Sequence, residues 1–169
     1  MREWLVASAL IEAPDGLLLV RNERRGGHSD WTTPGGVIDT TDESLLAGLT
    51  REVEEETGLR VTRWEGPLYE VRAVANDLGW VLRAEVWRAL EYVGELRVAD
   101  PDGIVVEAAF VDDDECGARL AAGAPWVCEP IAEWLVERWG PDDMRGYHYD
   151  VFGTRREDLR VRRVGPDRG

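Results

Sequence analysis

Lysine is absent from this chain of 169 residues, so arginine alone supplies its fixed positive charge. The 20 arginines are outnumbered by 34 aspartates and glutamates, which gives a formal net charge of −14 at pH 7. Long nucleic acids and anionic membranes both need a basic surface, so this charge disfavours either as a partner. Small phosphate compounds stay open as substrates, because a bound cation reverses the local sign of the field.

Cysteine is also scarce, and long apolar runs are missing. Cys116 and Cys128 are the only two cysteines, and we expect reduced thiols rather than a structural disulfide. No apolar run approaches the length of about 18 residues that would cross a bilayer, and the N-terminal residues lack a signal-peptide pattern. We therefore expect a soluble, globular and cytoplasmic protein.

The most informative stretch is residues 34–59, PGGVIDTTDESLLAGLTREVEEETGL. Pro34-Gly35-Gly36 predicts a turn, because this tripeptide neither continues a strand nor starts a helix. Ser44 is a suitable N-cap for a following helix, and Gly58 suits a left-handed C-terminal cap. Apolar residues at helical spacing predict the face that packs on a core, and they are Leu45, Leu46, Leu49 and Val53.

Three glutamates give this helix an unusual face. Glu52 and Glu56 are four residues apart and Glu55 lies beside them, so their carboxylates repel by roughly 3 kcal/mol per pair at about 5 Å. A divalent cation would convert that repulsion into binding energy, and dense oxygen ligands suit magnesium or manganese. A solvated acidic helix face is the alternative. Arg51, placed to brace the carboxylates, and the preceding Gly-Gly turn favour a site.

The same stretch resembles the Nudix box, which reads Gly, five residues, Glu, seven residues, then Arg-Glu-apolar-any-Glu-Glu-any-Gly-apolar. Residues 43–59 fit this pattern without a break, and the whole box spans residues 36–59. The one departure is that six residues, not five, separate Gly36 from Glu43. We interpret this as one extra residue in the loop 39–42, which leaves the helix unchanged.

The resemblance implies a fold and a reaction. The fold is α/β, a Nudix-type α/β/α sandwich with a mixed, curved β-sheet between helices. The reaction is metal-dependent hydrolysis of a phosphoanhydride bond in a nucleoside diphosphate linked to another moiety. ADP-ribose or a nucleotide sugar is mildly preferred as the substrate and a modified nucleoside triphosphate comes next, because no substrate signature downstream of the box is matched.

The resemblance also implies the catalytic groups. Mg²⁺, with Mn²⁺ as a substitute, would be held by Glu52, Glu55 and Glu56 together with the backbone at Gly36, while Arg51 would orient a ligand carboxylate. A box glutamate is one candidate for the base that activates water. Glu107, in a predicted strand over residues 104–111, is the other candidate, with an ordinary edge carboxylate as its alternative role.

Three residues outside the box are candidates for substrate binding. Arg24 and Arg25 fall in a polar, Gly-rich loop predicted over residues 22–30, which faces either a ligand or solvent. Trp80 is a candidate stacking platform for a base, and the alternative is a sheet-face or core aromatic.

Periodicity and turn residues predict the remaining elements. A hairpin is expected from strands over residues 4–11 and 17–21. A strand starting at residue 60 should break at Glu65-Gly66-Pro67 before a strand over residues 68–75. Further expected elements are a strand over residues 80–90 and an amphipathic helix over residues 125–139.

The chain changes character after Gly140-Pro141. We expect a Nudix hydrolase domain over residues 1–140 and a C-terminal extension over residues 141–169, where arginine and acidic residues nearly balance. The extension suits a β-hairpin, either packed on the domain or placed at a dimer interface, and a homodimer stays open.

Two other functions compete with hydrolysis. A catalytically silent Nudix-fold sensor of nucleotides would be expected to lose box carboxylates, and this chain keeps them. A Nudix-fold isomerase of prenyl diphosphates would need a Cys and His constellation, which two cysteines and two scattered histidines do not suggest.

Overall fold

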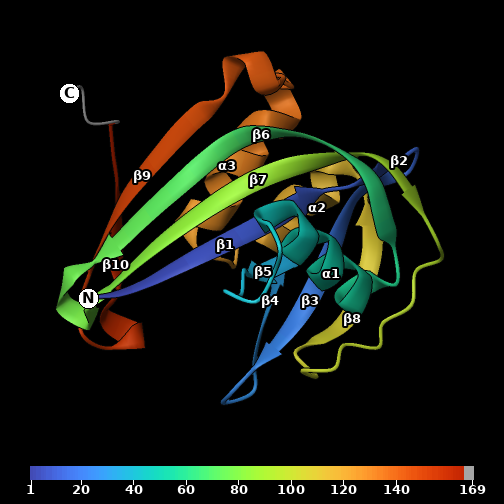
Figure 1. Ribbon diagram of the computed structural model, residues 1–169. Coiled ribbons are helices and arrows are strands. Elements are labelled where there is room, and N and C mark those ends of the chain that lie inside the picture. Colours follow the sequence, from blue (N-terminus) through green and yellow to red (C-terminus); the bar gives the residue numbers. More distant parts are fainter. Residues whose placement is uncertain (166–169) are drawn as a thin grey trace.

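The computed structural model describes residues 1–165 and contains two β-sheets and three α-helices (Figure 1). The larger sheet has six strands in the order β10-β9-β6-β7-β1-β5. The β1–β7 and β6–β9 pairs are parallel and the other pairs antiparallel, so the sheet is mixed. The strands of this sheet are β1 (Arg2–Leu10), β5 (Gly35–Val37), β6 (Arg60–Ala75), β7 (Trp80–Val93), β9 (Arg145–Phe152) and β10 (Arg160–Val164).

The smaller sheet is built around β3, which pairs with all three of the other strands in antiparallel fashion. Its members are β2 (Glu12–Ala13), β3 (Gly16–Arg24), β4 (His28–Thr32) and β8 (Val105–Val111). The helices are α1 (Leu45–Thr57), α2 (Asp113–Leu120) and α3 (Pro125–Glu137).

Two apolar clusters hold the helices to opposite faces of the larger sheet. Ala7 of β1 belongs to the cluster under α1, whereas Val71 and Val86 belong to the cluster under α2 and α3. Because successive side chains of a strand point to opposite faces, the α1 cluster and the α3 cluster lie on different sides. The predicted α/β/α arrangement with a mixed sheet is therefore confirmed.

The expected N-terminal hairpin is wrong in its pairing. β1 lies in the larger sheet, next to β7 and β5, while the chain crosses into the smaller sheet before β3. Only the short strand β2 forms a hairpin with β3. Both β1 and β3 are apolar enough to be covered on two faces, and local turn residues cannot reveal that they belong to different sheets.

Three predicted interruptions are also wrong. The turn expected at Pro34-Gly35-Gly36 is only a bend at Pro34, because Gly35 and Gly36 begin strand β5 and pair with β1. The loop expected over residues 22–30 is a tighter hairpin, because β3 continues to Arg24 and β4 begins at His28, with Gly26 and Gly27 both at positive φ in the turn. The break expected at residues 65–67 does not end a strand. β6 runs through it with a shift in register between Glu65 and Tyr69.

The end of the described chain adds two strands to the larger sheet. β9 pairs with β6, and β10 pairs with β9, so the extension lies beside the sheet (Figure 1). Tyr147, Tyr149 and Val151 of β9 are buried against the core. A boundary at residue 140 stays a prediction, and the last residues of the expected extension, 166–169, lie outside the described residues.

No helix within residues 1–165 is both long and apolar enough to span a bilayer. Cys116 and Cys128 are both free, as expected, and Cys116 is buried.

Candidate active site

Helix α1 begins and ends where its capping residues predict. The Ser44 side chain accepts a hydrogen bond from the backbone N–H of Ala47 at 3.0 Å, and Gly58 closes the helix at φ +77°. Leu49 and Val53 are fully buried, which fixes the rotation of the helix about its axis. As a result, the opposite side of the same turns presents the glutamates in a defined direction.

The Gly35-Gly36 segment lies directly against two of those glutamates. The backbone N–H of Gly35 donates to Glu56 Oε2 at 3.1 Å. A Cβ atom at Gly36 would lie only 2.9 Å from Glu52 Oε2, so a side chain there would collide with the carboxylate. A side chain at this position would push the Glu52 carboxylate away, so glycine allows the carboxylate and the backbone of β5 to approach each other closely.

Arg51 connects the loop before α1 to the carboxylates. Its guanidinium donates to both oxygens of Asp42 at 3.0 Å, to Glu52 Oε1 at 3.1 Å and to Glu55 Oε2 at 3.3 Å. The Arg51 hydrogen bonds hold the pKa of Asp42 below its usual range, so Asp42 keeps its charge and anchors the guanidinium. The predicted bracing role of Arg51 agrees with this geometry.

The acidic residue that holds Arg51 is Asp42 and not Glu43. Glu43 is exposed, whereas Asp42 lies over Gly48, where a Cβ would come within 2.7 Å of its Oδ2. Asp42 also follows Gly36 after five residues, the spacing that the box pattern specifies. The extra residue therefore lies between Asp42 and Arg51 rather than before the acidic position, and that spacing was the signal available in the sequence.

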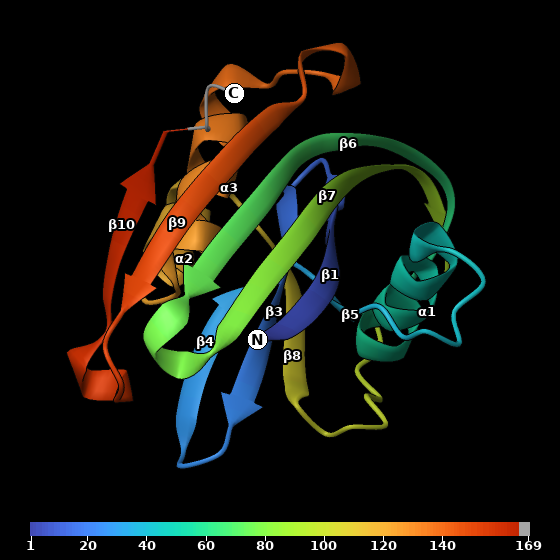
Figure 2. The ribbon, with the colours of Figure 1, turned by 60° about the vertical axis from the view of Figure 1, so that its left-hand side comes forward.

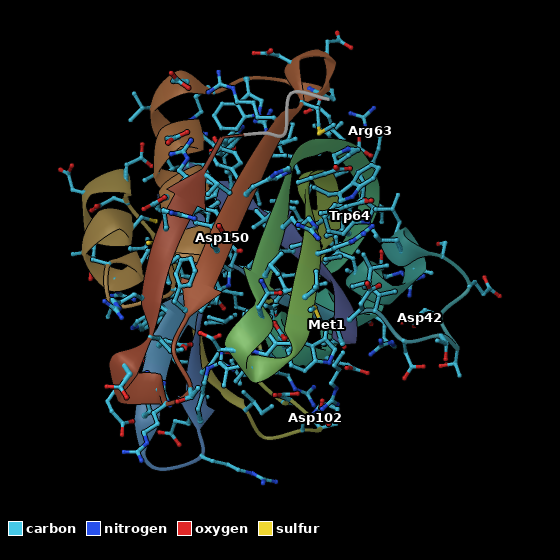
Figure 3. The ribbon with its side chains drawn as sticks, turned by 90° about the vertical axis from the view of Figure 1, so that its left-hand side faces the viewer. Met1, Asp42, Arg63, Trp64, Asp102 and Asp150 are labelled. Carbon is cyan, nitrogen blue, oxygen red and sulfur yellow. The ribbon has the colours of Figure 1, made fainter. Side chains whose placement is uncertain are left out.

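A second segment brings further acidic groups, which were not among the predicted site residues. The connection from β7 to β8, residues 94–104, runs past the C-terminal end of α1 (Figure 2), and Arg97 donates its backbone N–H to Thr57 O at 2.8 Å. Asp100 accepts backbone hydrogen bonds from Asp102, Ile104 and Val105 and so fixes the shape of the loop. Figure 3 labels Asp102 in this loop and Asp42 in the loop before α1.

These segments surround a cavity of about 630 Å³. One part of its lining is acidic, and we call Glu52, Glu56, Asp100 and Asp102 the acidic part of the cavity. Another part is apolar and aromatic, with side chains that belong to or pack on the core between the larger sheet and α3. This apolar part includes Tyr69, Val71, Leu82, Ala84, Val86, Trp126, Val127 and Ile131.

Burial governs the electrostatics of the acidic part. It raises the pKa of Glu56 to about 8, and the hydrogen bond from Gly35 only partly opposes that rise. Burial likewise raises the pKa of Glu52, against the effect of Arg51. Neighbouring carboxylates of Asp100 and Asp102 raise these pKa values further. The acidic part of the cavity is therefore short of positive charge, and cations would be bound favourably there.

The residues suit a divalent metal ion in donor chemistry, since hard carboxylate oxygens face a glycine backbone that no Cβ blocks. Within residues 1–165, however, no three His, Cys, Asp or Glu side chains are gathered closely enough to form a cage. On α1, the Glu55 carboxylate does not join those of Glu52 and Glu56. It turns toward Arg51 and lines a groove beside β6 instead of the cavity. The metal roles of Gly36, Glu52, Glu55 and Glu56 stay predictions.

Polar side chains of the smaller sheet also line the cavity. They are Asn22 of β3 and Asp30 and Thr32 of β4. Asn22 is 6% exposed and donates to Asp30 and to Thr32, each at 3.0 Å. Because Asp30 can only accept, the amide nitrogen of Asn22 must point to it and the amide oxygen is left for the cavity. No signal in the sequence pointed to these polar side chains, because a loop was predicted over residues 22–30.

Of the predicted substrate-binding residues, only Arg24 lines the cavity. It pairs with Asp30 at 2.8 Å, and although burial acts to raise the pKa of Asp30, hydrogen bonds from Arg24 and Asn22 hold that pKa below its usual value. Arg25 is exposed in the β3–β4 turn, beyond the end of β3, and does not line the cavity.

The prediction for Trp80 also needs correction. Its indole packs against Trp4 and Trp126 with ring centroids 6.0 Å from each, so it supports the sheet and is not part of the cavity wall. Trp126 is the aromatic residue that reaches the cavity. Trp80 was chosen because it is aromatic, and residue type does not indicate the direction of a side chain.

Glu107 is likewise outside the cavity. It is about half exposed and pairs with Arg21 at 3.0 Å across the β3–β8 ladder. This position of Glu107 agrees with its alternative role as an ordinary edge carboxylate. The acidic residues that approach the glutamates of α1 come from the loop before β8 and not from β8 itself.

Comparison with known proteins gives three results for this arrangement. The family profile described as "NUDIX domain" matches residues 3–126. A "MutT-like protein" from Streptomyces ambofaciens is 30% identical over 116 residues, which cover 69% of this chain and 68% of that protein. The matched residues thus include α1, the Gly35-Gly36 segment and the loop that holds Asp100 and Asp102.

Solved structures show the same fold. A NUDIX hydrolase from Nitrosomonas europaea is 26% identical with a TM-score of 0.65, and the match covers 84% of this chain and 95% of that one. The NUDIX domain of Shewanella oneidensis NrtR, solved in complex with ADP ribose, is 21% identical with a TM-score of 0.64 and covers 82% and 89% of the two chains. The second likeness is one of fold alone.

Proposed function

This chain belongs to the NUDIX family and is a Nudix-type pyrophosphohydrolase, and from that premise we propose that its cavity hydrolyses a phosphoanhydride bond of a nucleoside diphosphate linked to a second moiety. The observation that carries the proposal is the placement of Glu52 and Glu56. Their carboxylates are buried beside the Gly35-Gly36 backbone and share one cavity with Asp100 and Asp102.

The reaction depends on a divalent metal ion, for which Mg²⁺ is our first choice and Mn²⁺ a substitute. We assign its ligands to Glu52, Glu55, Glu56 and the backbone of Gly36. When bound, such an ion neutralises phosphate oxygens and lowers the pKa of water. Glu55 has to leave Arg51 Nη1, 3.3 Å away, to join the other two carboxylates.

The protein groups around these ligands position them. Asp42 fixes the guanidinium of Arg51, and Arg51 in turn orients the Glu52 carboxylate. Gly35 holds one oxygen of Glu56 through its N–H. The most suitable proton acceptors are Glu56 Oε1 and the Asp102 carboxylate, because neither accepts a hydrogen bond from any of the residues that the structure describes.

For the substrate we favour ADP-ribose or a nucleotide sugar, with a modified nucleoside triphosphate as the second choice. A cavity of about 630 Å³ is the size of ordinary small-molecule sites, which favours a compact nucleotide derivative. The aromatic ring of Trp126 and the free amide oxygen of Asn22 supply a stacking surface and a hydrogen-bond acceptor for a base or sugar. The ADP ribose in the NrtR domain supports the first choice.

A nucleotide sensor without catalysis is the alternative. The two functions differ in the role of the acidic part of the cavity. Hydrolysis uses its carboxylates, whereas binding of a nucleotide alone does not require Glu52 and Glu56 to be buried next to Gly35 and Gly36. We expect the enzyme to work in the cytoplasm, where its two free thiols would stay reduced.

The test is phosphate release, after treatment with a coupled phosphatase, from a panel of nucleoside diphosphate derivatives and modified triphosphates. Each compound is assayed with magnesium, with manganese and with a chelator. Turnover of one compound that requires the metal supports hydrolysis and identifies the substrate. Tight binding of one member without turnover in either metal would instead support the sensor.

A further inference from the structure

Asn22 is a nearly buried polar residue of the cavity wall, and one atom of its amide lacks a partner in the described part of the chain. Its side chain is 6% exposed, and the amide nitrogen donates to Asp30 Oδ1 and to Thr32 Oγ1, each at 3.0 Å. These two bonds use both hydrogens of the nitrogen. No residue within 1–165 donates to the Asn22 oxygen, which still reaches the surface of the cavity. A ligand that brings an N–H or O–H group would therefore be bound there.

The orientation of this amide is fixed by an ion pair beside it. Arg24 donates to both oxygens of Asp30, at 2.8 Å and 3.2 Å. Burial alone would raise the pKa of Asp30, but the hydrogen bonds from Arg24 and Asn22 hold it below its usual value, so Asp30 stays ionised and can only accept. Turning the Asn22 amide over would bring its oxygen against a carboxylate oxygen. The amide consequently presents its oxygen, and not its nitrogen, to the cavity.

The ring of Trp126 lies on the same side of the cavity as this amide. The chain enters α3 through Gly123, where a Cβ atom would lie 3.8 Å from the backbone oxygen of Trp31 in β4. Trp31 lies between the two residues of β4 that bind Asn22. Trp126 and Asn22 both line the cavity near this contact, so a flat ring can stack on the indole while its edge faces the amide oxygen.

The wall around Asn22 offers acceptors rather than donors. Asn22 pairs in register with Val105, and the backbone N–H of Val105 is already bound by Asp100 Oδ2 at 2.9 Å. The guanidinium of Arg24 is directed to Asp30. The edge of a bound base therefore meets oxygen atoms here. An amino group on that edge donates to them, whereas an oxo group would be repelled.

We propose that Asn22 selects nucleotides whose base carries an exocyclic amino group, as adenine and cytosine do, and that Arg24 and Asp30 are positioning residues for this selection. The amide oxygen of Asn22 accepts a hydrogen bond from the amino group. An oxo group in its place, as in hypoxanthine or uracil, would set two oxygens against each other and leave both without a donor. This selection rests on the proposed function, since it takes the cavity as the nucleotide site.

Two pairs of nucleotides test the selection without turnover. AMP and IMP differ by an amino or an oxo group on a purine, and CMP and UMP differ in the same way on a pyrimidine. None of the four has a phosphoanhydride bond, so isothermal titration calorimetry in magnesium buffer measures binding alone. In each pair that binds wild-type protein, the amino compound should bind more tightly by on the order of tenfold. Equal dissociation constants within each pair, or no binding of any of the four at millimolar concentration, would overturn the proposal.

The variant Asp30→Asn tests the positioning role. Asparagine at this position can donate its own N–H to the Asn22 oxygen, so the Asn22 amide can turn over and the preference for an amino group should fall to about twofold or less. Asn22→Leu removes the acceptor and should abolish the preference. Asp150→Asn is the matched control, because Asp150 pairs with Arg162 at 3.0 Å between β9 and β10 and does not line the cavity. It should keep the wild-type ratio of dissociation constants.

Circular dichroism establishes that each variant is folded. If Asp30→Asn does not fold, Asn22→Leu and Asn22→Ser carry the test, and an unchanged ratio in either folded variant would contradict the assignment to Asn22.

Further measurements separate this proposal from its alternatives. If a ribose hydroxyl donates to Asn22 instead of the base, dAMP would bind wild-type protein more weakly than AMP while AMP and IMP bind alike, and selection by the base would be wrong. Turnover of a nucleoside diphosphate derivative without any preference within the pairs would overturn only this proposal. A clear preference without turnover of any compound would support the selection and contradict hydrolysis.

Discussion

Helices α1 and α3 each present a set of three neighbouring glutamates, but the surroundings of the two sets are opposite. The α1 set is Glu52, Glu55 and Glu56, and the α3 set is Glu129, Glu133 and Glu137. In each helix the spacing alone would permit either a structural or a functional role. What separates them is whether the fold supplies donors to the carboxylates.

On α3 the strands of the C-terminal region provide those donors. Glu133 accepts from the Tyr147 hydroxyl at 2.7 Å and from Arg163, and Glu129 accepts from the Tyr149 hydroxyl at 2.9 Å. Glu137 pairs with Arg145. The Arg163 hydrogen bond holds the pKa of Glu133 below its usual value, so this carboxylate is stable as an anion.

On α1 the supply of donors is incomplete. Arg51 reaches Glu52 and Glu55, but within residues 1–165 the only donor to Glu56 is the backbone N–H of Gly35. Burial therefore raises the pKa of Glu52 and of Glu56. A carboxylate cluster that is buried without enough cations costs stability, and such a cost is typical of sites that bind a cation or transfer protons.

The largest effect that this comparison predicts is on activity. Glu56→Gln should lower metal-dependent kcat/KM by more than about 100-fold, because even groups that only support metal ligands usually contribute 10–100-fold. Glu133→Gln on α3 is the matched control and should keep activity within about twofold of wild type, since it touches only β9 and β10. Steady-state kinetics on the identified substrate checks both. Equal losses in the two variants would show that the two helices do not differ in function.

The second prediction concerns the stability of the metal-free protein. The pKa of Glu56 rises from an ordinary value of 4.5 to about 8 on folding, so between these values the folded state binds more protons than the unfolded state. Stability is therefore highest below pH 4.5 for this group and falls as pH rises toward 8, by on the order of 5 kcal/mol in total, of which roughly half is lost between pH 6 and pH 9. Urea denaturation in chelator at pH 6 and pH 9 should show the decrease.

Glu56→Gln provides the control for that pH effect. Glutamine cannot ionise, so the variant should lose most of the decrease and become more stable than wild type at pH 9. An unchanged pH dependence in the variant would assign the titration to another group.

The third prediction concerns the contribution of the α3 glutamates to stability. Glu133→Ala removes an acceptor from Tyr147 and Arg163, and it should lower the free energy of unfolding by about 1 kcal/mol, as expected for partly exposed hydrogen bonds. Because the pKa of Glu133 is depressed in the folded state, its stabilisation is present at neutral pH and is lost as pH falls through that depressed pKa. Thermal denaturation of the variant and of wild type at pH 7 and pH 3 tests both expectations. A larger loss of stability in the variant at pH 3 than at pH 7 would contradict them.

The smallest predicted effect tests the loop before β8. Asp102→Asn should lower kcat/KM by roughly tenfold without changing stability, because the carboxylate lines the cavity but holds no part of the loop together. Glu107→Gln, in the strand that follows, should have no effect on kcat/KM. A loss in Glu107→Gln alone would restore the original candidate for the base.

The sequence predicted local features well because their causes are local. Ser44 and Gly58 act on backbone groups within four residues, and the spacing of Leu49 and Val53 defines a helix face without reference to the rest of the chain. Arg51 was placed correctly with respect to Glu52 and Glu55 for the same reason.

Predictions that required distant partners were less successful. Arg25, Trp80 and Glu107 were chosen by residue type, and the structure directs each of them away from the cavity. A strand of known residues still has two faces and an unknown neighbour, and a shift of one residue reverses every side chain.

By itself, the sequence determined the α1 helix and the box of carboxylates, since caps, helical period and motif spacing are properties of adjacent residues. The tertiary structure alone decided that Asp42 rather than Glu43 holds Arg51, that Asp100 and Asp102 reach Glu52 and Glu56, and that α3 but not α1 receives a full set of donors. Those outcomes depend on which strands pair and which loops meet, and long-range packing of apolar faces fixes both.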